Sequence, residues 1–161
     1  MRRCNRSDLE AVLAIINDAA QAYQGIIPED RYHEPYMSLD ELIREMEDGV
    51  IFWGLEDENG LVGVMGIQKK GEVSLIRHAY VRTNQRGSGL GTKLLSHLCS
   101  LSDKPILIGT WASAEWAIRF YIKNGFYLVP EHHKMQLLQS YWNIPARQVE
   151  TSVVLSSKEY T

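Results

Sequence analysis

The sequence predicts an α/β protein of the α+β type, with a mixed, mostly antiparallel sheet of about six to seven strands flanked by about four helices. Three short apolar segments in the middle of the chain are separated by turn residues, as in an antiparallel meander. Amphipathic helical patterns lie before and after this meander. The 161 residues, 45% of them hydrophobic, predict one domain over residues 1–161.

The first third of the chain carries two signals for the start of a helix. Ser7 with Glu10, and Ser38 with Glu41, have the spacing of a capping box, and apolar residues at helical spacing follow each pair. The segment between them, residues 25–37, combines prolines, acids and aromatic residues without any period. We expect an ordered surface loop there.

Strands and helices then follow in a mixed order. The Asn59-Gly60 pair favours a tight hairpin turn between the first two strands, and Gly125 is suited to end a helix whose cap is Ser113. The predicted strands cover residues 50–55, 61–68, 73–81, 105–111, 126–129 and 149–155. The later predicted helices cover residues 90–101, 113–124 and, as a short helix, 133–141.

Composition excludes several classes of protein. A net charge of -3 argues against a nucleic-acid partner whose many phosphates must be neutralised. No apolar run reaches the roughly 20 residues of a membrane span, so we expect no membrane partner and a cytoplasmic location. Cys4 and Cys99 are expected to be free thiols, and the five histidines lack metal-ligand spacing, so no metal is expected. The sequence leaves open whether the protein forms a homodimer.

The stretch Gln85-Arg86-Gly87-Ser88-Gly89-Leu90-Gly91-Thr92 joins a predicted strand to a predicted helix. Bare amides at a helix N-terminus attract anions, and Arg82 and Arg86 add charges that pair with phosphate. Taken alone, the glycines are equally consistent with a tight turn. Their spacing is neither G-x-G-x-x-G nor a P-loop.

Two motifs carry a resemblance to a known family. Arg86-x-x-Gly89-x-Gly91 matches R/Q-x-x-G-x-G/A, and Tyr121 is followed after three residues by Gly125-Phe126. With these motifs the chain resembles the GNAT superfamily of N-acetyltransferases over nearly its whole length. The resemblance implies acetyl-CoA as co-substrate and a sheet splayed between its fourth and fifth strands to admit pantetheine.

The resemblance also assigns cofactor contacts. The residues it implies are Tyr80, Val81, Arg82, Arg86, Gly87, Ser88, Gly89, Leu90, Gly91, Thr92 and Asn124. Ala114 departs from the family pattern, because many members have asparagine there, and the pantetheine contact of that asparagine is in question. The segments 109–112 and 141–152 look like features of a narrower bacterial or archaeal subgroup.

Acetyl transfer to an amine needs a neutral amine, a place for charge on the tetrahedral oxygen, and a proton for the departing thiolate. By the resemblance Tyr121 is the general acid, with a core tyrosine as the alternative. Glu72 and His78 are candidates for the base, beside a solvated strand end, a core histidine or water. A backbone amide near Tyr80 or Val81 is the expected oxyanion contact.

The loop before the second helix occupies the position that lines the acceptor pocket in the family, and its acids suit a cationic amine, although acidic loops are often only solvated. The candidate acceptor residues are Glu29, Tyr32, Glu34, Tyr36 and Trp111; Trp111 and Trp142 fit either packing or a pocket wall. We expect an N-acetyltransferase acting on a primary amine of a small molecule or protein. A non-catalytic acyl-CoA-binding sensor or interaction module is the alternative, and a nucleotide-binding enzyme of another class is a third, weaker hypothesis.

Overall fold

A seven-stranded sheet runs through the described part of the protein, in the order β1-β2-β3-β4-β5-β7-β6. The structure is a computed structural model that describes residues 1–85 and 87–161. All neighbouring strands are antiparallel except β4 and β5, which are parallel, so the predicted fold class is confirmed. The strands are β1 Arg2–Arg3, β2 Ile51–Asp57, β3 Gly60–Lys70, β4 Val73–Val81, β5 Ile106–Trp111, β6 Tyr127–Leu128 and β7 Ser152–Ser156.

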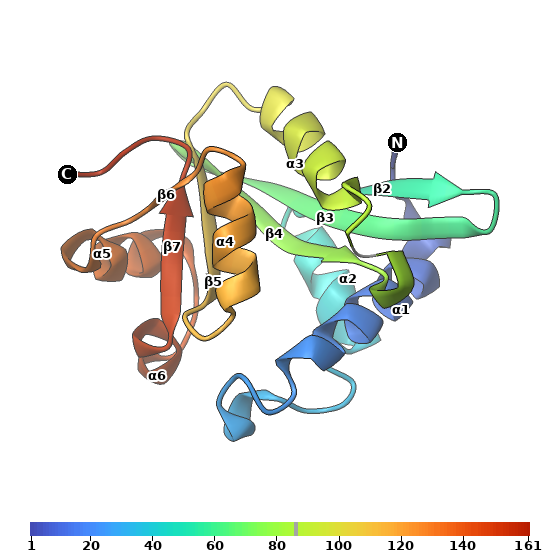
Figure 1. Ribbon diagram of the computed structural model, residues 1–161, viewed down its shortest axis with the longest axis horizontal. Helices are drawn as coiled ribbons and strands as arrows, with labels where there is room; N and C mark the ends of the chain where they lie inside the picture. The colour runs from blue at the N-terminus through green and yellow to red at the C-terminus, as the bar shows by residue number, and fades with distance from the viewer. Residues whose placement is uncertain (86) are drawn as a thin grey trace.

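Helices cover both faces of this sheet (Figure 1). Side chains alternate between the faces of a strand, so Ile76 packs against α3 and α4 while its neighbour Leu75 packs against α5. Helices α1 and α2 cover Phe52 and Val64 on the α5 side of the sheet. The helices are α1 Leu9–Ala20, α2 Leu39–Glu47, α3 Leu90–Ser100, α4 Glu115–Lys123, α5 Glu131–Tyr141 and α6 Ala146–Glu150.

No helix among residues 1–85 and 87–161 combines the length and the apolar character needed to cross a membrane. Cys4 and Cys99 are both free thiols, as expected.

The N-terminal capping box lies two residues earlier than predicted. A short 3-10 helix, Arg6–Asp8, precedes α1, so Asn5 is the cap, and Asn5 N–H donates to the Asp8 carboxylate at 2.8 Å. Arg2 donates to both oxygens of that carboxylate at 2.8 Å. The predicted Ser7–Glu10 box is therefore wrong, whereas Ser38 does cap α2 by accepting from Glu41 N–H at 3.2 Å.

Asp8→Asn is expected to destabilise the fold by about 1–2 kcal/mol at pH 7, because Arg2 loses its ionic partner. Hydrogen bonds from Arg2, and then from the Asn5 amide, lower the pKa of Asp8 to about 2. A depressed pKa contributes stability above the ordinary value near 3.8, and this contribution is lost as pH falls towards 2. Urea unfolding should show the difference from wild type shrinking over that window. Asp103→Asn, at an exposed site, is the control and should show no such trend.

Two boundaries predicted in the last third of the chain are wrong, and a third is confirmed. Helix α4 begins at Glu115 with the buried Ala114 as its cap residue, so Ser113 is not the cap. Residues 146–150 form α6 and not the start of a strand, because Pro145 fixes a backbone angle that suits the start of a helix. Gly125 has a φ of 90° and ends α4 as predicted. The two-residue β1 and the larger number of helices were not predicted.

Candidate active site

The site forms where β4 and β5 separate. Residues 74–76 of β4 pair with residues 106–108 of β5, and beyond these pairs the two strands diverge (Figure 1). On its other side, β4 changes register with β3 between Val64 and Gly66, so His78 and Ala79 lie opposite the single residue Met65. This is a β-bulge, a feature that re-aims side chains. His78 has a φ of 54°, which is rare for a residue with a side chain and is typical of functional sites.

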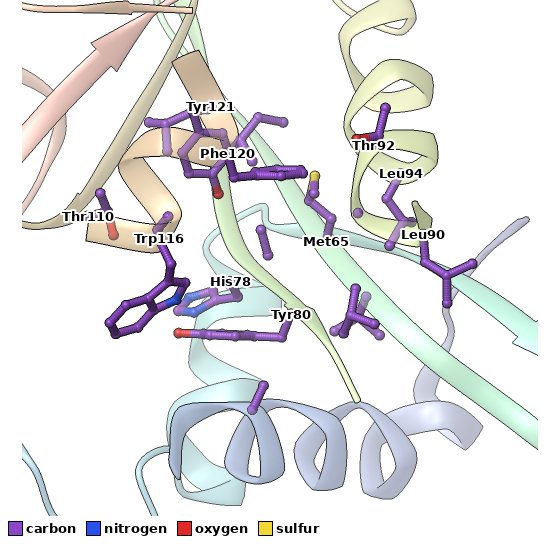
Figure 2. A pocket seen from close by; sticks show the side chains of 18 of the residues that line it. Met65, His78, Tyr80, Leu90, Thr92, Leu94, Thr110, Trp116, Phe120 and Tyr121 are labelled. Atoms are coloured by element: carbon purple, nitrogen blue, oxygen red, sulfur yellow. The ribbon is translucent and has the colours of Figure 1, made fainter. Parts of the chain in front are cut away.

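A pocket of about 560 Å³ occupies the opening between the strands. Figure 2 shows His78, Tyr80, Trp116 and Tyr121 towards one end of it, with Leu90, Thr92 and Leu94 from α3 towards the other. We name it the cofactor pocket after the predicted cofactor residues in its lining. Its described lining includes the predicted cofactor residues Tyr80, Val81, Gly87, Gly89, Leu90, Gly91 and Thr92.

The glycine turn opens the entrance to this pocket. Gly87 and Gly89 both have a φ of 80°, which glycine adopts at little cost, and no atom lies within 4 Å of where a side chain would begin. A Cβ on Gly91 would lie 3.1 Å from the Phe120 ring. The turn therefore presents backbone, at the N-terminus of α3, to whatever binds there. The predicted residue Arg86 lies outside the described residues.

Three predicted cofactor residues do not line the pocket in the described structure. Arg82 Nε donates to the Leu61 carbonyl at 2.9 Å, and Asn124 Nδ2 donates to the Phe120 carbonyl at 2.8 Å. The Ser88 hydroxyl donates to the carbonyl of Gln85. Sequence reasoning missed Gln85 and Lys123, which do line the pocket.

A second pocket, of about 160 Å³, shares part of its lining with the first, and we name it the acceptor pocket after the predicted acceptor residues Tyr36 and Trp111 that line it. It is lined by aromatic side chains from α1's C-terminal extension, the loop before α2, β4, β5 and the segment after α5. Six residues line both pockets: Tyr23, Ile76, His78, Tyr80, Gly109 and Thr110. The two pockets therefore meet across a shared wall where the sheet divides.

Of the predicted acceptor residues, Tyr36 and Trp111 line the acceptor pocket, and Trp111 Nε1 donates to the Tyr36 hydroxyl at 3.1 Å. Burial raises the pKa of Tyr36 to about 12. Glu29 and Glu34 are exposed and do not line it, and Tyr32 donates its hydroxyl to Glu34 at 3.0 Å. The acids of this loop thus face away from the described lining of the pocket.

His78 lies on the shared wall, with a carboxylate behind it. Its Nε2 lies 3.3 Å from Oε2 of Glu45 in α2, a distance that suits an ion pair, although the angle departs from that of a good hydrogen bond. Burial opposes ionisation of Glu45, but His78 and Arg77 outweigh it, so the pKa of Glu45 is lowered. Nothing in the sequence connects Glu45 with His78, because 32 intervening residues separate them.

Tyr121 lines the cofactor pocket from α4 and is buried. Burial, and then the nearby Tyr23, raise its pKa well above the ordinary value of 10. The hydroxyl therefore keeps its proton throughout the neutral range, as a proton donor must.

Glu72 lies at the other end of β4, in the exposed turn that joins β3 to β4. His78 lies six positions further along the chain, which in a strand corresponds to about 20 Å. Of the two predicted bases, the fold thus places only His78 at the described pockets.

The opened sheet edge beside a glycine-rich helix start, with a second pocket that shares part of its lining, offers two adjoining sites, and together with the family match that follows, it defines the protein as an acyltransferase. Residues 48–128 match the family described as Acetyltransferase (GNAT) domain. This match spans half of the chain, and the chain belongs to the GNAT family.

Solved structures share the fold at low sequence identity. PaiA N-acetyltransferase from Thermoplasma acidophilum, in complex with coenzyme A, has a TM-score of 0.73 at 17% identity, covering 98% of this chain and 97% of that one. A GNAT acetyltransferase from Staphylococcus aureus has a TM-score of 0.70 at 20% identity, covering 97% of each chain. The ribosomal-protein-S18-alanine N-acetyltransferase from Escherichia coli has a TM-score of 0.64 at 16% identity, covering 96% and 89%. No curated protein sequence matches the chain significantly.

Proposed function

We propose that the protein is an N-acetyltransferase that uses acetyl-CoA and transfers the acetyl group to a primary amine by direct attack. The observation that carries this proposal is the shared wall between the cofactor pocket and the acceptor pocket. Substrates bound in the two pockets lie next to each other along the lining residues that both pockets share. The amine can therefore attack the acyl group directly, without a covalent enzyme intermediate. A solved relative of the same fold is a complex with coenzyme A, which supports the choice of cofactor.

The residues of the cofactor pocket fit coenzyme A. Gly87 and Gly89 leave the start of α3 open to a diphosphate, whose charge the helix dipole stabilises. Beyond Ile76 the pairing of β4 with β5 ends in the described structure, so backbone groups on that edge of β4 are free to bind the amides of pantetheine. Acetyl-CoA supplies a thioester, whose carbonyl carbon the amine attacks.

His78 is the proposed base. It lines both pockets, and the Glu45 carboxylate lies 3.3 Å from its Nε2, on the side of α2. His78 takes a proton from the amine as the new bond between nitrogen and carbon forms. An amide at the bulge, in the stretch from Ala79 to Val81, stabilises the negative charge on the carbonyl oxygen.

Tyr121 is the proposed acid on the cofactor side of the wall. As the bond between carbon and sulfur breaks, the buried Tyr121 donates its proton to the departing thiolate. His78 then releases its proton to solvent and Tyr121 takes one up from solvent, so both side chains return to their starting states. The site residues therefore divide into a base at the acceptor and an acid at the thiol.

The proposal is tested by following release of the coenzyme A thiol from acetyl-CoA in the presence of primary amines. We expect amine-dependent release, and we expect His78→Asn to lower kcat/KM about 100-fold. Asparagine accepts a positive φ more readily than most residues, so this variant keeps the bulge while it removes the base. Thermal unfolding should confirm that it folds.

The same assay separates the alternative, a non-catalytic acyl-CoA-binding sensor. If calorimetry shows tight binding of acetyl-CoA and no amine leads to release of thiol, the sensor hypothesis is favoured and the transferase hypothesis is wrong.

A further inference from the structure

Five of the fourteen described residues that line the acceptor pocket are aromatic, beside polar residues such as Thr110, Gln148 and Ser152. The centroids of Tyr23 and Tyr36 lie 5.3 Å apart, and those of Tyr23 and Tyr80 lie 6.3 Å apart, in tilted and edge-on arrangements. Aromatic rings prefer such arrangements with a further ring. The aromatic side chains that line the pocket are Tyr23, Tyr36, Tyr80, Trp111 and Trp142.

Gly109 allows one of these walls to exist. A Cβ at Gly109 would lie 3.2 Å from Cε2 and Cζ2 of Trp142, so the indole rests directly against the backbone of β5. Gly109 itself lies on the wall that the two pockets share. Trp142 therefore forms a flat apolar surface close to the point at which the acyl group and the amine meet.

The charges around the acceptor pocket disfavour a polycation. Among its described lining residues there is no aspartate, glutamate or lysine. The lining residue Arg77 is held by Glu45 at 3.4 Å and by Gln68 at 3.2 Å, and Arg31 donates to the lining residue Gln148 at 2.9 Å. A second positive charge on the acceptor would be desolvated here without a partner. A single ammonium is stabilised by the faces of the rings.

The size of the pocket and its rim restrict the acceptor further. An apolar cavity of about 150 Å³ is enough to hold one benzene ring, and this pocket has a volume of about 160 Å³. The loop before α2 is tied to α6 by Asp30 and Arg147, whose atoms approach to 3.1 Å, and by the bond from Arg31 to Gln148. These ties narrow the approach for a folded protein.

From these observations we infer that the preferred acceptor is an arylalkyl monoamine: a primary amine on a short chain that carries one aromatic ring and no second positive charge. The ring lies among the aromatic side chains, against Trp142, and the amine reaches His78 on the shared wall. This inference names the substrate class and rests on the proposed transferase function.

Steady-state rates with saturating acetyl-CoA test the inference on four acceptors: phenethylamine, hexylamine, spermidine and a short peptide with an N-terminal alanine. We expect kcat/KM for phenethylamine to exceed that for hexylamine about tenfold, with spermidine and the peptide lower still. If spermidine or the peptide is the best acceptor, the inferred class is wrong while the transferase function stands.

Binding of phenethylamine to the protein loaded with coenzyme A, measured by calorimetry, separates the two proposals further. Binding without turnover of any amine would overturn the transferase function and support the character of the pocket. Absence of both binding and turnover would overturn the inference as well.

Trp142→Leu tests the wall itself. We expect KM for phenethylamine to rise about tenfold, with a smaller change for hexylamine and no change in coenzyme A affinity. Trp53→Leu is the control, because Trp53 lines neither pocket in the described structure and packs against His97. An equal rise in KM for both amines would show that Trp142 only supports the fold, and the inference would fail.

Discussion

Gly89→Asp is expected to weaken coenzyme A binding by at least about 100-fold. The new carboxylate stands at the N-terminus of α3, beside the position proposed for the diphosphate, and competes with it for the same amides. Repulsion between like charges about 4 Å apart costs about 4 kcal/mol at an effective dielectric constant of 20. Aspartate tolerates the left-handed backbone of this position, where φ is 80°, so the fold should survive.

Gly71→Asp is the matched control for this variant. Gly71 has a φ of 60°, is exposed, and lies in the turn between β3 and β4, outside the described lining of both pockets. The Gly71→Asp variant therefore adds the same charge, and a similar strain at a positive φ, without approaching the cofactor. Calorimetry should show wild-type affinity for Gly71→Asp. If Gly89→Asp and Gly71→Asp bind coenzyme A with equal affinity, the glycine turn does not bind the diphosphate.

Tyr121→Phe is expected to lower kcat about 100-fold without changing coenzyme A affinity. Phenylalanine keeps the ring that packs between Phe120 and Phe126, with centroids 5.2 and 6.1 Å away, and removes only the hydroxyl. Because burial keeps the pKa of Tyr121 above its ordinary value, the wild-type enzyme should show no loss of activity through this group as pH rises from 7 to 9.

The control for this variant is Tyr127→Phe, on an exposed edge strand. Thiol release at saturating amine and acetyl-CoA gives kcat, and thermal unfolding checks that both variants fold. A fall in kcat of less than about threefold would make Tyr121 a packing residue and leave the proton to water.

Much of the fold follows from local patterns. The strands of the meander, the helix after the glycine turn and the end of α4 at Gly125 lie close to their predicted residues, because each depends on short-range spacing or on a backbone angle suited to glycine. The errors are local as well. A 3-10 helix at Arg6–Asp8 moved the first cap, and Pro145 gave α6 in place of the start of β7.

The candidate site divides differently. The glycine turn and Tyr121 belong to local motifs, so the sequence alone indicates both. The acceptor side depends on contacts between distant segments: Glu45 reaches His78 from α2, and Trp142 reaches Gly109 from the segment after α5. The acids of the loop before α2 predict a pocket for a cationic substrate. In the structure, however, Glu29 and Glu34 are exposed and do not line the described acceptor pocket.

The sequence by itself determined the class of fold, the glycine turn and the tyrosine of the cofactor side, because these features depend on periodicity and on fixed spacing along the chain. Only the tertiary structure decided what lies behind His78 and around the acceptor. The separation of β4 from β5 and the bulge at His78 depend on pairings with β3 and β5, and these pairings join residues far apart in sequence. The walls of the acceptor pocket come from segments that no local sequence pattern connects. Their chemistry can therefore be read only from the tertiary structure.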